Sequence, residues 1–340
     1  MADYSKLTNK MVIVGNLMEK NLTVEERETT IRGGGKEKTI TCKVIGKKDF
    51  KNPSLLVRVV KEDGSFNDVG VHTYPIAQYK LDDKGNKVDN PRFKDMLAVI
   101  EDFNAKVDGG DGDMIRVLGS INANEYASSK DGKEFDFHTF PQISAYAIYK
   151  STDTEYLAEG EVSGIIKSIN PEVKVGSDDS EDETGRLKVE FYTFSYTGKA
   201  YPINFIVGED LADDFEDLYS AGDSANVVFE VVKRHVGGDK KKKAAFGRSS
   251  NIASGYDIEE FVIVGGDEPF DEDNAKYITK KEFKEALAER QNYIDQTISD
   301  AKDNAKGKKS DHVESKSKGL GRKSNIDDDD NDISDSDLPF

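Results

Sequence analysis

The stretch PRFKDMLAVIEDFNAKV (91–107), followed by GDMIRVLGSINANEY (112–126), decides the fold because it places one helix directly before a strand. The apolar residues of its first part recur at helical spacing, at Phe93, Met96, Leu97, Ile100 and Phe103. Pro91 suits a first helical turn, and the pair Gly112-Asp113 opens the next strand. The sequence therefore predicts a short helix that lies between strands.

Strands are also expected on both sides of this pair. Four upstream segments show β-branched residues or period-2 alternation, namely MVIVGNL (11–17), KTITCKVIG (38–46), LLVRVV (55–60) and DVGVHTY (68–74). Downstream, EFDFHTFPQISAYAIY (134–149) indicates one more strand. The first segment is thus a set of strands, one helix and two further strands.

A second segment repeats this order. It contains GEVSGIIKSINPEV (160–173), a hairpin in RLKVEFYTFSYTGKAYPINFIV (186–207), a short helix, GDSANVVFEVVK (222–233) and YDIEEFVIVGG (256–266). Strand, strand, strand, helix, strand, strand is the order of an OB-fold, a small Greek-key barrel. We therefore predict a mainly β protein with two tandem OB-fold barrels, over residues 1–150 and 156–267. A different small barrel or sandwich with a helix is the alternative.

The remaining chain is divided into three parts by composition. Residues 277–305 form an expected helix, in which Thr279 and Glu282 are placed as a capping box. Residues 306–326 are rich in Lys, Ser and Gly, which predicts a flexible basic linker. The end, DDDDNDISDSDLPF (327–340), is an expected disordered acidic tip with seven Asp and no Lys or Arg.

Charge is segregated along the chain, whose formal net charge is −18. Residues 1–61 carry 13 Lys and Arg against 7 Asp and Glu, and residues 302–323 carry eight basic against three acidic residues. Such segregation suggests an anionic ligand in one place and a cationic partner in another. The part outside the tip remains acidic, which favours a second hypothesis: an acidic DNA mimic that sequesters a basic partner.

Several function classes are excluded or disfavoured. Cys42 is the single cysteine, so an internal disulfide and a cysteine-based zinc site are ruled out. No stretch is long and apolar enough for a spanning helix, and MADYSKLTNK has no signal-peptide core, so we expect a cytoplasmic protein without membrane contact. GGGKEK (33–38) is no phosphate-binding loop, and the four His form no zinc motif. We expect no cofactor, no metal and no catalysis.

Binding residues are better supported than catalytic ones. In RLKVEFYTFSY, period-2 alternation puts Tyr192, Phe194 and Tyr196 on one face, near Lys188 and Lys199. Rings that stack on bases, with cations for phosphates, suit a single strand of nucleic acid. The alternative is that Phe194 and Tyr196 curl under the helix or cover a subunit contact.

The first segment offers a more basic version of such a surface. Gly33, Gly34 and Gly35 indicate a mobile hairpin tip or flap. The expected DNA-binding residues of this segment are Arg32, Lys36, Lys38, Lys43, Lys47, Phe50, Arg58 and Tyr74. A second basic loop, KRHVGGDKKKKAAFGR (233–248), adds Lys233, Arg234 and Lys241. Loops between barrel strands commonly close over an oligonucleotide, which favours nucleic acid as the ligand.

Two stretches resemble a known family. NKMVIVGNLMEKNLTV (9–24) resembles the opening strand of bacterial single-stranded-DNA-binding proteins, and DSDLPF (335–340) resembles their acidic tip. The departures are the doubled barrel and the absence of tryptophan, on which that family usually stacks bases. With them the chain looks more like a phage-encoded relative or a two-domain bacterial form. The resemblance implies sequence-independent binding and protection of single-stranded DNA in replication, recombination and repair.

The resemblance also assigns a role to the tip. In the family, a terminal Phe enters an apolar pocket of a replication or repair protein, while aspartates face a basic rim. The expected partner-binding residues are therefore Asp335, Asp337, Leu338, Pro339 and Phe340. The partners implied are a helicase, a polymerase or a recombination mediator, in the cytoplasm of a bacterium or of a phage host. Because the family assembles four barrels, a homodimer is implied for this chain, with a monomer as the alternative.

Overall fold

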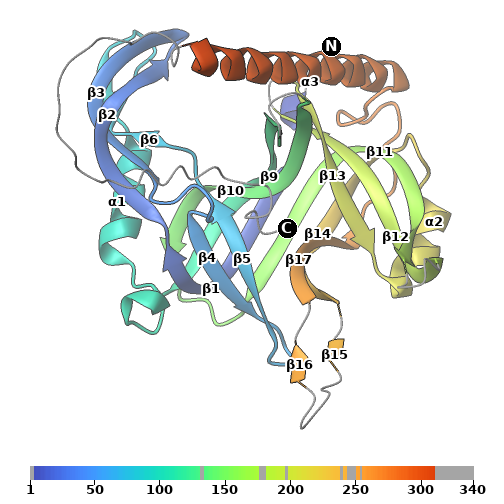
Figure 1. Ribbon diagram of the computed structural model, residues 1–340. Helices are drawn as coiled ribbons and strands as arrows, with labels where there is room; N and C mark the ends of the chain where they lie inside the picture. Colours follow the sequence, from blue (N-terminus) through green and yellow to red (C-terminus); the bar gives the residue numbers. More distant parts are fainter. Residues whose placement is uncertain are drawn as a thin grey trace, which may run out of the picture.

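A computed structural model describes residues 4–130, 134–175, 181–195, 198–237, 240–242, 250–252 and 255–310. The protein is mainly β, with two groups of strands and one long helix near the C-terminus (Figure 1). Strands of both groups join in one ten-stranded sheet. The described helices include none that is long and apolar enough to cross a membrane.

Five strands of the first half pair in a closed circuit. In the order of pairing they are β1 (Asn9–Lys20), β4 (Leu55–Val60), β5 (Phe66–His72), β10 (Asp136–Lys150) and β9 (Met114–Ser128), which pairs again with β1. The pair β5–β10 is parallel and the other four pairs are antiparallel. In β4 the side chains alternate, so that Leu55, Val57 and Val59 are buried.

The second half repeats the circuit. Its strands, in order of pairing, are β11 (Leu157–Val175), β12 (Glu181–Phe194), β13 (Ala200–Val207), β17 (Gly255–Gly266) and β14 (Ser224–Gly237), which pairs again with β11. Here β13–β17 is the parallel pair. The repeat of strand order expected from the sequence is therefore present in the strand pairings. Between β14 and β17, the two short strands β15 (Lys240–Lys242) and β16 (Ser250–Ile252) pair with each other.

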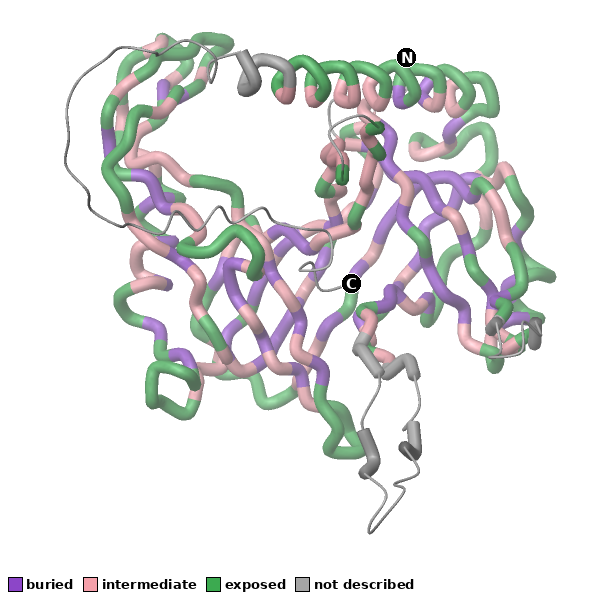
Figure 2. The backbone as a smooth tube through the Cα atoms, viewed as in Figure 1, coloured by how far each residue is buried: buried purple, intermediate pink, exposed green. Residues whose placement is uncertain are grey.

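The two halves are joined through their first strands. Asn9–Val14 of β1 pairs antiparallel with Leu157–Val162 of β11. Next to this pair, the Asn9 amide donates to the Ile121 carbonyl oxygen (2.8 Å) and to the Tyr201 hydroxyl (2.9 Å). One continuous apolar core runs through both halves, and Figure 2 shows buried backbone across the junction. The circuits are thus parts of one packed body.

Short helices close the ends of the circuits. α1 (Pro91–Asp102) begins at the N-cap Asn90, whose side chain accepts from the Arg92 backbone N–H, and it buries Phe93, Met96 and Val99. It ends earlier than the expected residue 107, and Lys106–Asp108 forms a separate 3-10 turn, η2. In the second half, the turn η3 (Glu209–Leu211) leads into α2 (Ala212–Leu218), which buries Ala212 and Phe215.

A long hairpin lies outside the first circuit. It consists of β2 (Leu22–Gly33) and β3 (Lys36–Lys47), with β6 (Ile76–Ala77) paired to β3. The expected strand 38–46 is therefore an arm strand rather than a member of the circuit. The arm projects from the body at the left of Figure 1.

The hairpin tip that was expected at Gly33, Gly34 and Gly35 is present, and it is braced by a neighbouring segment. A second hairpin, β7 (Tyr79–Leu81) and β8 (Lys87–Asp89), lies against β2. Gly33 and Gly34 approach the backbone of Leu81 and Asp83 so closely that a Cβ atom would clash there. The Lys36 ammonium donates to the Lys84 carbonyl oxygen (2.8 Å).

The long helix α3 (Lys280–Ser310) crosses the top of the molecule in Figure 1. The capping box is confirmed, because the Glu282 N–H donates to Thr279 Oγ1 (3.2 Å) and the Thr279 N–H donates to Glu282 Oε2 (3.1 Å). The start of the helix and the residues before it cover part of the second circuit. This separate apolar cluster contains Ile165, Tyr192, Phe194, Ala200, Ile278 and Ala286, with Tyr4, Leu7, Phe283 and Leu287 packed against it. Tyr4 belongs to the N-terminal turn η1 (Tyr4–Lys6).

Candidate nucleic-acid interface

Exposed aromatic side chains are confined to the first half. Among the described side chains, the exposed aromatic ones are Phe50, Phe66, Tyr74, Phe140, Tyr146 and Tyr149. In the second half the described aromatic side chains of the strands are buried in the core. Since stacking on bases requires an accessible ring, the first half is the part of the described chain that can stack on a nucleic acid.

Two of these rings flank the place where β5 and β10 separate. The parallel pairing of these strands ends at His72 and Ser144. Tyr74 and Tyr146 each follow two residues later, Tyr146 still on β10 and Tyr74 in the segment between β5 and β6. Tyr146 is also the extra residue of a β-bulge between Ala145 and Ala147, and such a residue has no partner in the β9–β10 ladder. The sheet opens here.

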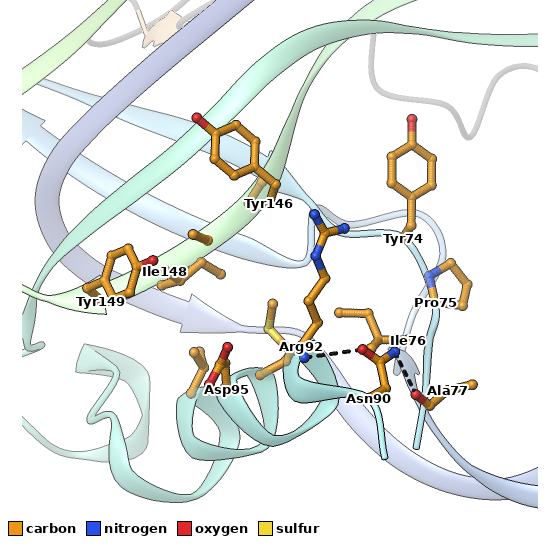
Figure 3. Close-up of a pocket in the computed structure, with 14 residues that line it drawn as sticks. Tyr74, Pro75, Ile76, Ala77, Asn90, Arg92, Asp95, Tyr146, Ile148 and Tyr149 are labelled. Atoms are coloured by element: carbon orange, nitrogen blue, oxygen red, sulfur yellow. Dashed lines mark hydrogen bonds between the residues drawn. The ribbon is translucent and has the colours of Figure 1, made fainter. Parts of the chain in front are cut away.

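The opening contains a pocket of about 330 Å³, here called the tyrosine pocket. Its polar and aromatic lining residues are Tyr74, Tyr146, Tyr149, Asn90, Arg92 and Asp95, and the rest of the lining is apolar residues of α1, β6 and β10 and Pro75. Figure 3 shows the Arg92 side chain rising from α1 between the rings of Tyr74 and Tyr146. Arg92 and Asp95 are both exposed, and within the described chain neither forms an ion pair.

A second hollow of about 260 Å³, here called the basic hollow, adjoins the tyrosine pocket through Pro75, which lines both. It lies at the base of the arm, and Arg27, Lys47, Lys48 and Phe50 line it, with one acidic residue, Glu25. The ring of Phe50 is 80% exposed. Pocket and hollow together present rings and cations side by side, which is what a strand with flat bases and charged phosphates requires.

Lys47 and His72 meet at the floor of this region. The Lys47 ammonium donates to Nδ1 of His72 (2.9 Å), because an ammonium group has donors only. Burial, and secondarily the charge of Lys47, lowers the pKa of His72 to about 4. Burial also lowers the pKa of Lys47, although Asp49 opposes this shift. His72 is therefore neutral near pH 7 and holds Lys47 in place.

The other basic residues expected in the first half differ in availability. Lys36 and Lys38 share the face of β3 that carries Val44 and Gly46, whereas Lys43 lies on the opposite face. All three lysines are exposed. Arg32 is paired with Glu37 at the arm tip (3.3 Å).

Arg58 is not a free cation, contrary to expectation. Its Nε and Nη2 atoms donate to the two carboxylate oxygens of Asp68 (2.7 and 2.8 Å), and its guanidinium lies 3.8 Å from the centre of the Phe66 ring. A bidentate pair of this kind holds the side chain in one geometry. Arg58 and Phe66 are therefore engaged with each other in the strand pair β4–β5.

The expected aromatic face of the second half is closed. Tyr192 is 6% exposed and Phe194 is 4% exposed. Tyr4 stacks on Phe194 with ring centres 4.5 Å apart, and Phe283 meets Tyr192 edge-on at 5.4 Å. The expectation that these two rings bind bases is wrong, because α3 and the N-terminal turn cover them. For Phe194 this is the alternative that the sequence had left open.

The cations of the second half are partly neutralised. Lys199 pairs with Glu125 (2.5 Å), and Arg234 pairs with Glu172 and Glu260 (3.2 and 2.7 Å). Lys188 and Lys233 are exposed. Tyr196 and the tip residues Asp335, Asp337, Leu338, Pro339 and Phe340 lie outside the described residues, and for Lys241 the structure describes the backbone in β15 only.

Five site residues escaped the sequence reasoning: Arg27, Lys48, Arg92, Tyr146 and Tyr149. Tyr146 and Tyr149 lie in a segment that the sequence identified only as a strand. The bulge at Tyr146 interrupts the period-2 alternation from which an outward-facing side chain could have been predicted. Helical spacing did not mark Arg92 either, because it lies in the first turn in line with the buried residues Met96 and Val99, at i+4 and i+7.

Comparisons with known proteins complete the description. A family model described as YorF matches residues 8–300. No curated protein matches the chain. Among solved structures, the wild-type single-stranded DNA binding protein from Thermus aquaticus is similar with a TM-score of 0.40 and 11% identity, over 79% of this chain and 96% of that one. A deletion mutant of the same protein matches with a TM-score of 0.38 and 12% identity, over 79% and 98%.

Proposed function

We propose that this chain, which belongs to the YorF family, binds single-stranded DNA as a non-catalytic protein, chiefly through its first half. The observation that carries the proposal is the location of every exposed aromatic ring of the described chain in residues 50–149. Four of these rings, Phe50, Tyr74, Tyr146 and Tyr149, line the adjoining tyrosine pocket and basic hollow. The cations that line them are Arg27, Lys47, Lys48 and Arg92. Stacking contributes about 1–3 kcal/mol per base and tolerates any base.

The strand pairings support an OB-fold for each half. Taken in chain order, each circuit pairs its strands in the order first, second, third, fifth, fourth and first again, with the third and fifth parallel. Each circuit also has its helix between the third and fourth strands. We assign the barrels to residues 1–150 and 156–267. In such barrels the ligand lies on the second and third strands and on the loop after the first strand. In the first half that loop is the arm.

The acidic tip adds a second, separable part of the proposal. Residues 327–340 would recruit replication, recombination or repair proteins, with Phe340 as the apolar anchor and the aspartates as the steering charges. Because α3 continues to Ser310, five residues beyond the expected end at 305, the tether would be residues 311–326. This part is supported by the sequence alone, as are the homodimer and the cytoplasmic location.

Fluorescence anisotropy of a labelled oligo-dT, at rising salt and with duplex DNA as competitor, tests the proposal. We expect binding that duplex DNA does not displace, with a salt slope of about −0.7 per phosphate contact. Replacing Tyr74 and Tyr146 by Ala should weaken binding at least tenfold, since two stacking rings of about 1 kcal/mol or more each are lost. Replacing both by Phe keeps the rings and should change little.

A matched control comes from the second half. Lys188→Ala removes an exposed cation far along the chain from the pocket and should weaken binding by less than the loss of the two rings. Absence of binding at low salt, both for the full chain and for a chain without residues 327–340, would refute the proposal. The DNA-mimic hypothesis would then be tested next.

A further inference from the structure

The geometry points to one unstacked nucleobase as the occupant of the tyrosine pocket, and we propose that this pocket prefers guanine. The inference rests on the proposed function, because it concerns one position within a bound single strand. Every other position would still be bound without regard to sequence.

The pocket has the size and the walls for a single base. Its volume of about 330 Å³ is at the lower end of the range for small-molecule sites, so it admits one base rather than a stacked run. Tyr146 and Tyr149 supply exposed rings from β10, and Tyr74 supplies one from the segment that follows β5. Bases that are turned out of a strand are commonly held by such rings and by guanidinium planes. The arrangement in Figure 3, with Arg92 between two tyrosines, offers both.

The polar groups of the pocket select among bases. Arg92 and Asp95 are three residues apart on α1, so they project from one side of the helix into the same pocket. A carboxylate accepts two parallel hydrogen bonds, and a guanidinium only donates. Guanine presents two adjacent donors, N1–H and the N2 amine, next to the acceptor O6. Asp95 can accept from the two donors while Arg92 donates to O6.

The other bases satisfy this pair less well. Adenine has no donor at N1, and its exocyclic group is an amine where Arg92 requires an acceptor. Cytosine presents an acceptor at N3 toward the carboxylate. Thymine has one donor between two carbonyl oxygens, so it can use only one carboxylate oxygen. Leaving a charged group unpaired in a ligand contact is costly, and this cost produces the preference.

A proline-rich peptide is the competing occupant, because tyrosine-lined grooves also accept that type of chain. Two observations favour the base. Arg92 stands in the middle of the aromatic walls, and the adjoining basic hollow brings Lys47 and Lys48 beside the pocket. Cations on both sides of a base site are suited to the phosphates that flank a base.

The test uses the full chain and labelled oligo-dT in which one central thymine is replaced by guanine, hypoxanthine or adenine. We expect the guanine strand to bind at least about tenfold more tightly than the adenine strand, since tenfold corresponds to about one hydrogen bond to a charged group. The hypoxanthine strand lacks the N2 amine and should fall between them. Asp95→Asn should remove the difference in affinity between the guanine strand and the adenine strand, a ratio that is measured within the one variant.

Asp102→Asn is the matched control, since Asp102 is an exposed carboxylate at the other end of the same helix. It should keep the full guanine preference. Equal affinity for all four strands, with oligo-dT still bound, would overturn the guanine pocket and leave the proposed function intact. A guanine preference that survives Asp95→Asn would also overturn the proposal. A proline-rich peptide provides a further test. If it displaced plain oligo-dT from the wild type but not from the Tyr74→Ala, Tyr146→Ala variant, the peptide would be the occupant of the pocket and the proposal would be wrong. No binding of any strand would mean that the proposed function itself is wrong.

Discussion

At the scale of single residues, the hydrogen bond between Lys47, which lines the basic hollow, and His72 ties stability to pH. The depressed pKa of His72, about 4, means that the unfolded chain binds a proton between roughly pH 6.5 and 4 that the folded chain does not bind. The stability contributed by neutral His72 is thus fully present above pH 6.5 and is lost as the pH falls toward 4.

We therefore predict that His72→Gln flattens the acid side of the stability curve. Between pH 7 and pH 4, the free energy of unfolding of the wild type should fall by about 3 kcal/mol more than that of the variant. This value corresponds to the lowering of the His72 pKa from 6.5 to about 4. Urea unfolding at several pH values measures this difference. Between pH 7 and 8 the two curves should run parallel, and parallel curves down to pH 4 would contradict the prediction.

A second pair of residues separates stability from binding. Phe194 is 4% exposed and Phe50 is 80% exposed. Phe194→Ala should lower the free energy of unfolding by about 3 kcal/mol or more, because it leaves a cavity under α3, while the folded variant keeps its DNA affinity. Phe50→Ala should do the reverse, with a several-fold weaker affinity for oligo-dT and an unchanged urea midpoint. Loss of DNA affinity in folded Phe194→Ala would show that the covered face takes part in binding after all.

At the scale of elements, α3 is fixed to both halves by one buried charge cluster. Arg290 on α3 is 7% exposed and donates to Glu125 Oε1 (2.7 Å) of β9, to the Ala200 carbonyl oxygen (3.0 Å) and to Thr139 Oγ1 (3.1 Å). Lys199, at the start of β13, pairs with the other oxygen of Glu125 and lies 3.5 Å from the centre of the Tyr293 ring. The cluster joins the first half, the second half and the helix.

Removing Arg290 should release α3. The side chain of Glu125 is 2% exposed, and in Arg290→Ala it keeps Lys199 but loses the buried Arg290. Because a buried carboxylate is then only partly compensated, we expect the free energy of unfolding to fall by about 3 kcal/mol. Amide hydrogen exchange across residues 286–300 should accelerate before the strands of the circuits open. Lys281→Ala breaks an exposed pair with Glu285 on the same helix and should cost less than about 0.5 kcal/mol. Equal effects of the two substitutions would mean that the cluster does not hold the helix.

How far the elements follow from sequence depends on what covers each face. Alternation places Tyr192 and Phe194 away from the barrel interior, but whether such a face is open depends on a helix that begins about ninety residues later. The arm strand β2 was missed because residues 25–28 are all charged and exposed, so no apolar alternation marks them. By contrast, α1 and the capping box of α3 were readable, since local spacing and caps decide them. The tyrosine pocket could not be predicted, because it forms where the pairing of β5 with β10 ends, and no local sequence pattern indicates that position.

At the scale of the whole molecule, the closed circuits follow from the repeated order of elements, whereas their junction does not. Strand β1 pairs with β4 and β9 within its own circuit and also pairs with β11 of the second half. The sequence of β1 carries no separate sign of this third partner. Charge is also distributed at this scale. The proposed binding surface lies in the first half, and the densest negative charge lies in the last 14 residues.

We predict that the acidic tip competes with DNA for the basic hollow. Deleting residues 327–340 removes seven carboxylates, so affinity for oligo-dT should rise about threefold at low salt, and the gain should vanish near 0.3 M salt, where screening is strong. A full-length chain with the seven Asp replaced by Asn should show the same gain, which separates charge from length. Phe340→Ala keeps every side-chain charge and should leave the affinity unchanged. If both the truncated chain and the Asn chain bound DNA with unaltered affinity and salt slope, the tip would be shown not to compete.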